Sequence, residues 1–497
     1  MTPSALLQLQ YGQPLFLTPE ILRQTSASSS SPGALRYPHF WGLGEKLLGP
    51  PSVETAGSGV SDSVASLRDY CRLEDRASIL LLRDISHPPS KTGSEATSTN
   101  VSFDTWFGIR KSSPAEYMES VKAWSPDLAV SFHDEINRTA GSNRTRACAE
   151  RASLWLQECV DLRKRHQKQR VDNQTSSSGV LPSLLAFLPC VADNAGRNFA
   201  LEKILSIAQR SHQHDEALST SSSSSSTTES TIAGFVLGCL GQGETSQERK
   251  EILSEVVPRL PETHLRLISG VVTPLEILEC VALGVDVFDS DYPNVLTSAG
   301  LAATFQIKYS ASTPIVKTAT RLLEEDSIGA LAHPSPRAER HVDDEGEDTR
   351  RGEDVDLKRK RIPALSGTQI AEALVADRLR QILTADPLPR VYLRSSRFLN
   401  DESPLLSSCG CFACSGLSRE KAAEFLPATK DKRPISHPGH MKCYVNHLLE
   451  TGELLGNVLL TAHNVYHFNA FFAEVRASIE GGYFEAYKEW FVTVNSQ

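Results

Sequence analysis

Residues 232–288 read IAGFVLGCLGQGETSQERKEILSEVVPRLPETHLRLISGVVTPLEILECVALGVDVF, and this stretch decides the fold class. Apolar runs at 232–237, 265–268 and 285–288 alternate with segments of helical pattern, one opening at Ser246 and one at Pro274 behind Thr273. Continuous apolar runs are typical of strands covered on both faces, and repeated strand–loop–helix units are typical of a parallel sheet. The stretch therefore predicts an α/β fold.

The same alternation extends toward the N-terminus, with apolar runs at 79–82, 128–132 and 184–188. Pro114 opens a predicted helix behind Ser113, a residue type that caps helices well. This many units favours a closed (β/α)8 TIM barrel over a doubly wound sheet. The chain also lacks a G-x-G-x-x-G pattern after its first strand, which argues against a dinucleotide-binding fold.

The pattern of apolar residues changes after Tyr444, and this change divides the chain. Apolar residues there recur at helical spacing, interrupted by Gly452, and a stripe from Phe468 to Ile479 continues the pattern. We therefore expect a barrel over residues 1–400 and a helical subdomain over 401–497. Three polar segments are predicted to be insertions, of which the first two are too polar to offset the entropy of ordering; they are 219–231, 334–363 and 415–441.

Composition excludes several classes of protein. The 497 residues include 51 Lys+Arg and 60 Asp+Glu, so a net charge of -9 rules out a globally basic nucleic-acid coat. The start lacks the pattern of a signal peptide, and no apolar stretch is long enough for a transmembrane segment. Ten cysteines are too few for a disulfide scaffold. We expect a cytoplasmic protein.

Cys409-x-Cys411-x-x-Cys414 is the strongest chemical signal in the sequence. Three thiols on one tight loop are typical of a structural Zn²⁺ site, which needs a fourth ligand. Spacing leaves that ligand open among five histidines: His437, His440, His447, His463 and His467. A closed site with four protein ligands has no position for activating water, so its predicted role is stability.

Several motifs together resemble one family, the tRNA-guanine transglycosylases. They occur in the expected order: GFVLGCLGQGE at 234–244, HLRLISGVVTP at 264–274, GVDVFD at 284–289, LRSSRF at 393–398 and LLTAHN at 459–464. The resemblance implies a zinc-bearing (β/α)8 protein that exchanges a guanine in the tRNA anticodon for a 7-deazaguanine base. It also implies that His463 is the fourth zinc ligand, although counting from Cys414 would favour His440.

Departures from the family pattern fall at its functional positions. Asp289 occupies the place of the family's nucleophilic aspartate, but Pro293-Asn294-Val295 replaces the Pro-Thr-Arg that follows it. The second catalytic aspartate, expected in an Asp-Gly pair before Ser113, is missing, with Asp104 two positions away. Residues 187–191 offer no base-reading glutamine, and residues 133–135 (His-Asp-Glu) only partly match a substrate-reading Phe-Asp-Glu.

The chain is therefore most similar to the non-catalytic branch of the family. The resemblance implies an accessory subunit without catalytic residues of its own, with one structural Zn²⁺. It would pair with a catalytic subunit and support exchange of guanine for queuine at the wobble position of tRNA. Family membership also implies peripheral association with the mitochondrial outer membrane. One alternative is an active transglycosylase with Asp289 as nucleophile, and another is an unrelated zinc-binding barrel for a small molecule.

Overall fold

The fold was obtained as a computed structural model. It describes residues 7–8, 78–82, 96–105, 108–124, 126–136, 138, 140–172, 181–221, 230–271, 273–288, 292–309, 383, 386–416 and 439–495. Asp289, His437 and the predicted insertion at 334–363 lie outside these residues. Most of the predicted insertion at 415–441 lies outside them as well.

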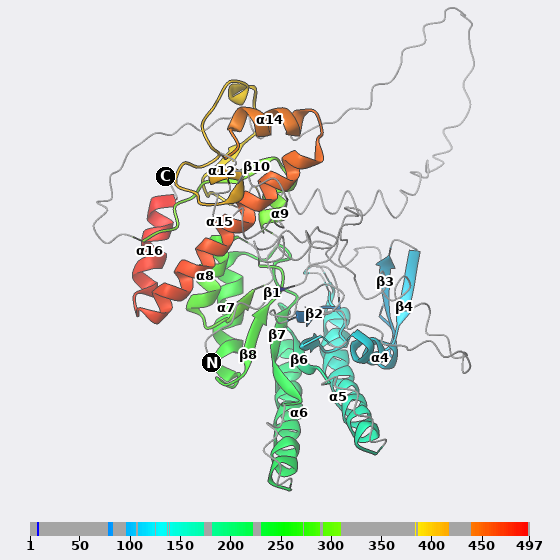
Figure 1. The fold of residues 1–497 in the computed structure, drawn as a ribbon. Coiled ribbons are helices and arrows are strands. Elements are labelled where there is room, and N and C mark those ends of the chain that lie inside the picture. The colour runs from blue at the N-terminus through cyan, green and yellow to red at the C-terminus, as the bar shows by residue number, and fades with distance from the viewer. Residues whose placement is uncertain are drawn as a thin grey trace, which may run out of the picture.

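A curled parallel sheet forms the centre of the molecule (Figure 1). Its seven described strands run in the order β1-β2-β5-β6-β7-β8-β9: Leu7–Gln8, Ser78–Leu80, Leu128–Val130, Ser183–Pro189, Ile232–Gly238, Leu265–Ile268 and Val287–Phe288. Every neighbouring pair is parallel. The predicted α/β class is confirmed. In the described part of the chain the sheet is a curled half-barrel, so a closed eightfold barrel stays a prediction.

Helices connect successive strands, and the sequence pattern predicted those that open at Pro114, Ser246 and Pro274. They are α4 (Pro114–Trp124), α5 (Ser142–Asp172), α6 (Asn194–Ser221), α7 (Ser246–Val256) and α8 (Pro274–Ala282), and a 3-10 turn, η2 (Val257–Arg259), follows α7. Thr273 caps α8 in a complete capping box with Glu276, which confirms the predicted start of this helix. Helices α5 and α6 extend well beyond the strands (Figure 1).

Strands β6 and β7 supply the middle of the hydrophobic core. Leu184 through Leu188 are all buried, and so are Phe235 through Leu237 on the next strand. Side chains on both faces of these strands are covered, which explains why the runs read as continuously apolar. Helix α5 packs Trp155 against the core, where its ring meets Phe132 edge-on.

The C-terminal unit is built on an antiparallel pair of strands, β10 (Leu301–Ala303) and β11 (Arg390–Tyr392). After the 3-10 turn η4 (Ser396–Phe398), the described residues form four helices: α12 (Phe412–Ser415), α14 (Lys442–Glu450), α15 (Leu454–Glu480) and α16 (Phe484–Asn495). Gly452 has φ +74° between α14 and α15, so the predicted interruption is a left-handed helix stop. The predicted buried stripe is right for Phe468 and Phe471 but wrong at Ile479, whose side chain is exposed.

Some elements were not anticipated. A hairpin, β3 (Val101–Thr105) with β4 (Gly108–Ser112), precedes α4, and a short helix, α9 (Tyr292–Ser298), precedes β10. Within the predicted 219–231 insertion, α6 continues to Ser221 and Thr231 is buried. The backbone N–H and hydroxyl of Thr231 both donate to the carboxylate of Asp215.

Candidate metal centre

The three cysteines of the 409–414 loop converge because the loop closes on itself. Cys411 is the N-cap residue of α12, and its sulfur accepts the backbone N–H of Cys414 at 3.3 Å. A second segment supports the loop from outside, where the backbone N–H of His440 donates to the carbonyl of Ala413 at 2.7 Å. Gly439 is needed beside it, since a Cβ at that position would overlap the carbonyl of Cys414.

His463 on α15 completes the group. The three sulfurs and one imidazole nitrogen lie within 4.8 Å of one another, and all four residues are buried. The Nδ1 atom of His463 is 3.7, 3.6 and 3.3 Å from the sulfurs of Cys409, Cys411 and Cys414. Nitrogen and sulfur ligands of a tetrahedral zinc ion lie roughly 3.5 Å apart, given bonds of about 2.0 and 2.3 Å. The group therefore has the size of a tetrahedral site.

The tautomer of His463 suits a ligand as well. Its Nε2 atom lies 2.8 Å from the carbonyl oxygen of Ala303, which can only accept, so Nε2 carries the proton. In the neutral ring, the lone pair on Nδ1 then faces the sulfurs. Metal-binding histidines commonly donate their other ring N–H in this way, which fixes the ring.

Asn464, next to His463, holds the same piece of backbone. Its Oδ1 accepts the N–H of Ala303 at 2.9 Å, while its Nδ2 donates to the carbonyl of Leu301 at 2.9 Å and to Thr297 Oγ1 at 3.1 Å. Both polar groups of Ala303 are thus bonded to consecutive residues of α15. One turn further, His467 repeats the contact, with its Nε2 2.9 Å from the carbonyl oxygen of Phe305.

None of the other described candidate histidines belongs to the four-residue group, although His467 makes a side-chain hydrogen bond with Cys409. His440 stacks on Tyr444, with ring centroids 5.5 Å apart, and meets Phe412 edge-on. His447 is exposed on α14, and His467 faces Phe305. Of the four candidates that the structure describes, His463 is the one within ligand distance of all three thiols.

The thiols of the cluster shift one another's pKa values in opposite directions, and hydrogen bonds with Cys409 and Cys411 raise the pKa of Cys414. Hydrogen bonds from Cys411 and Cys414 hold the pKa of Cys409 far below its usual range. Burial lowers the pKa of His463, but its hydrogen bonds with Cys409 and Cys411 outweigh burial and raise it from 6.5 to about 9, so a bound cation would displace a proton from Nδ1. Thiolate is the form that binds a divalent cation, so the donor set can hold a metal ion.

At the carboxyl edge of the sheet, the residues matched to base reading contact each other. The rings of His133 and Phe187 stack with centroids 3.8 Å apart and an angle of 7°. Asp134 is buried and pairs with two guanidinium groups of α5, those of Arg144 and Arg151. The side chain of Glu135 accepts Gln242 Nε2 at 3.0 Å. Asp289 lies outside the described residues, and nothing is described of the Asp104 side chain.

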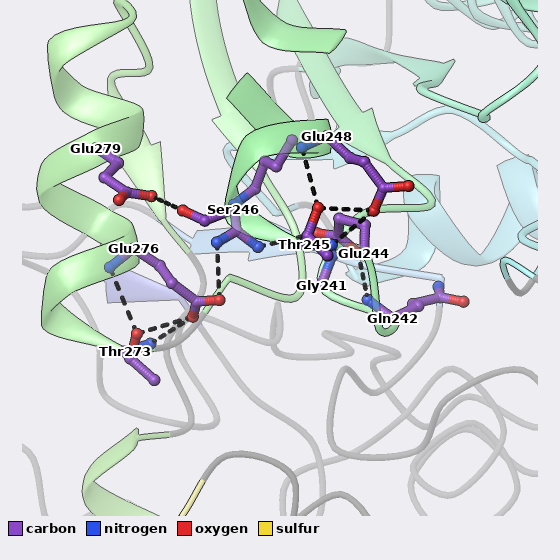
Figure 2. Close-up of polar contacts among 10 residues, drawn as sticks. Gly241, Gln242, Glu244, Thr245, Ser246, Glu248, Thr273, Glu276 and Glu279 are labelled. Carbon is purple, nitrogen blue, oxygen red and sulfur yellow. Dashed lines mark hydrogen bonds and ion pairs between the residues drawn. The ribbon is translucent and has the colours of Figure 1, made fainter. Parts of the chain in front are cut away.

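Sequence reasoning missed a buried ionic network that fixes the turns after β7 and β8 (Figure 2). Glu244 accepts the backbone N–H groups of Gly241 and Gln242 at 2.6 and 2.9 Å. Arg249 on α7 joins Glu244 to Glu276 of α8, at 2.9 and 2.8 Å. Burial lowers the pKa of Arg249, yet the two carboxylates outweigh it, so the guanidinium stays charged.

The repeated pattern T-x-x-E could have indicated part of this network. Thr245 with Glu248, and Thr273 with Glu276, form matching capping boxes at the starts of α7 and α8 (Figure 2). Arg249 carries no such local signal, because its partner on α8 is 27 residues away.

The fold and the cluster together define the class: an α/β protein with a curled parallel sheet and, in its C-terminal unit, a Cys3His group that could hold a metal ion. A family model described as queuine tRNA-ribosyltransferase matches residues 203–497. The chain belongs to the queuine tRNA-ribosyltransferase family.

Among the curated relatives are proteins named queuine tRNA-ribosyltransferase accessory subunit 2, from several animals. The chain is 25% identical to the human protein over 402 residues, which cover 79% of this chain and 72% of that protein. It is 25% identical to the Xenopus laevis protein, covering 83% and 77%. The Ixodes scapularis protein is 22% identical over 96% of this chain and 88% of its own length.

Among the helices that the structure describes, none combines the length and the apolar character needed to cross a membrane.

Proposed function

We propose that the chain is a non-catalytic accessory subunit of a queuine tRNA-ribosyltransferase and supports exchange of guanine for queuine at the wobble position of tRNA. The observation that carries this proposal is the state of the carboxyl edge of the sheet. There Asp134, the residue nearest to the family's base-reading carboxylate, is 2% exposed and bonded to two arginines. The names of the relatives agree with this role.

Freeing Asp134 for a base would be costly. Arg151 donates to it through Nε at 3.0 Å and Nη2 at 2.6 Å, and Arg144 donates through Nη2 at 2.6 Å. Removing one partner from a buried ion pair typically costs about 3–5 kcal/mol. Two guanidinium groups already donate to the carboxylate, so a hydrogen bond from an amide or amino group of a base would have to replace one of these bonds.

We propose that Cys409, Cys411, Cys414 and His463 bind one structural Zn²⁺. The donor set supports zinc because three thiolates and one imidazole suit its tetrahedral preference. Such an ion would fasten the 409–414 loop to α15, and through Ala303 to β10. We retain the proposed boundary at residue 400, with a closed (β/α)8 barrel before it and the zinc-binding subdomain after it.

The partner would be a catalytic subunit of the same family, bound through the C-terminal unit. We define the aromatic face as Phe412, His440 and Tyr444, whose rings are in contact. Phe412 and Tyr444 are 37% and 41% exposed, and Met441 beside them is 45% exposed. Exposed aromatic side chains with polar tips are typical of the centres of protein interfaces. Peripheral association with the mitochondrial outer membrane remains part of the proposal by family resemblance.

One exchange assay tests the role. The purified chain is incubated with tRNA and labelled guanine, first alone and then with the catalytic subunit of the same organism. We expect exchange only with both chains present, and no effect of Asp289→Asn in this chain. Exchange by the isolated chain that Asp289→Asn abolishes would instead establish the catalytic alternative, which the presence of Asp289 in the sequence favours.

A second experiment addresses the partner contact. Tyr444→Asp should weaken the complex by placing a charge on the aromatic face. The matched control is Val492→Asp on α16, where a side chain of similar exposure is changed on a different helix. Equal complex formation by both variants, measured by analytical ultracentrifugation, would contradict the proposed contact surface.

A further inference from the structure

The stacked pair of His133 and Phe187 is positioned by Ser131 and by the space that Gly238 leaves. Phe187 lies on β6, and its backbone N–H donates to Ser131 Oγ at 3.0 Å. His133 Nδ1 lies 2.8 Å from the carbonyl oxygen of the same serine, so Ser131 anchors both rings. On β7, Gly238 leaves room for the phenyl ring, since a Cβ there would overlap it.

The geometry of the pair is unusual for two protein side chains. Aromatic pairs generally prefer offset or edge-on arrangements with centroids about 4.5–7 Å apart. Here the centroids are 3.8 Å apart and the planes differ by 7°, so the imidazole covers the phenyl face directly. This is how a planar heterocyclic ligand lies on an aromatic platform.

The location is equally specific. His133 follows β5, and Phe187 lies near the end of β6, so both belong to the edge formed by the carboxyl ends of parallel strands. Ligands of parallel α/β folds bind at this edge. His133 is 6% exposed, so its imidazole occupies buried space at this edge.

We propose that His133 is an internal plug, in which its imidazole occupies the place on Phe187 where a purine-like base would otherwise stack. It is thus a specificity-determining residue, which excludes a base from this edge of the sheet. Its biological meaning rests on the proposed accessory role, but the binding property itself does not.

Hydrogen-bonding groups lie in the same two loops. Glu135 is two residues beyond His133 and accepts Gln242 Nε2. Gln242 Oε1 is buried and has no hydrogen-bond partner among the described residues. A carboxylate and an unused amide oxygen are acceptors that suit the N–H groups of guanine. The five-membered ring of a purine matches imidazole in shape.

Three variants test the plug. His133→Gly removes the imidazole, His133→Phe keeps the place filled, and His264→Gly is the matched control. His264 also lies against a phenylalanine, Phe235 of the neighbouring strand, but at 5.7 Å and a tilt of 41°. The probes are guanine, 7-deazaguanine and imidazole, with binding measured by calorimetry and by the shift of the melting temperature.

We expect the His133→Gly chain to bind guanine or 7-deazaguanine at least about tenfold more tightly than the wild type. His133→Phe and His264→Gly should bind no better than the wild type. If His133→Gly fails to melt cooperatively, His133→Ala is measured in its place.

Two outcomes would overturn the proposal. In the first, the wild-type chain binds guanine as tightly as the truncated variant. In the second, the truncated variant binds imidazole but neither base, so the space fits only the native side chain. Both are independent of the exchange assay, so a failure of the accessory role remains distinguishable from a failure of the plug.

Discussion

Replacing Asn464 with alanine should loosen the proposed metal site without touching any of its four ligands. The Asn464 side chain is 1% exposed and makes three hydrogen bonds, to Ala303, Leu301 and Thr297. A net contribution of about 1 kcal/mol for each predicts a loss of roughly 3 kcal/mol in the free energy of unfolding. Since Ala303 also accepts His463 Nε2–H, zinc affinity should fall by about tenfold or more.

Asn495 provides a control of the same chemistry. It is also 1% exposed, and its amide bonds the backbone N–H and carbonyl of Gln306 at 2.7 and 3.0 Å and the carbonyl of Phe491 at 3.1 Å. Asn495→Ala should therefore cost similar stability in urea. It should leave zinc affinity unchanged, because Gln306 has no hydrogen bond to the imidazole.

The assay is competition for zinc with a chromogenic chelator, alongside urea unfolding of the same samples. Equal zinc affinities for the two variants would refute the reasoning, whether both fell or both stayed at the wild-type value. Such a result would mean that Asn464 acts through stability alone and that Ala303 does not position the ligand.

Three further predictions follow from the metal group, the ionic network and a buried histidine. Cys411→Ser should release zinc and lower solubility, which elemental analysis and light scattering would detect; unchanged metal content would contradict it. Arg249→Met leaves the buried Glu244 carboxylate without its guanidinium partner, so we expect a loss of about 3–5 kcal/mol in urea unfolding. The exposed Arg146→Met should cost less than about 0.5 kcal/mol. Burial lowers the pKa of His264 below 6.5, so the unfolded chain binds a proton at this residue more readily than the folded chain does. The free energy of unfolding should therefore fall as the pH drops below 6.5. This fall should be smaller in His264→Gln, as measured by urea unfolding at several pH values.

Local pattern was enough for the elements whose sequence and surroundings agree. The strand predicted at 265–268 has the same bounds in the structure. Thr273 caps α8 as predicted, because the residues of a capping box lie within four positions of the sequence. Helix α5 was missed, although Cys148, Trp155 and Cys159 recur on one buried face. Its second half is strongly polar, and this obscured the stripe.

The site was predictable only in part, for a spatial reason. Three cysteines within six positions indicated a metal group. The histidine that joins them is 49 residues beyond Cys414, and spacing alone did not distinguish it from four other histidines. The family resemblance selected His463, and the structure places it at the sulfurs. The stack of His133 on Phe187 has no local signature, because the two residues meet only when β5 and β6 pair.

The contacts of His463 with Ala303 and of His467 with Phe305 fix the spacing between the two histidines. Four residues of helix advance about 6.0 Å, and two residues of extended chain advance about 6.6 Å. The spacing of two imidazoles one helical turn apart therefore nearly equals the spacing of alternate carbonyl groups on the extended segment. Inserting a single residue between these histidines would rotate the second by about 100° around the helix axis and destroy that coincidence. The length of this short interval is thus fixed by geometry, independently of which side chains fill it.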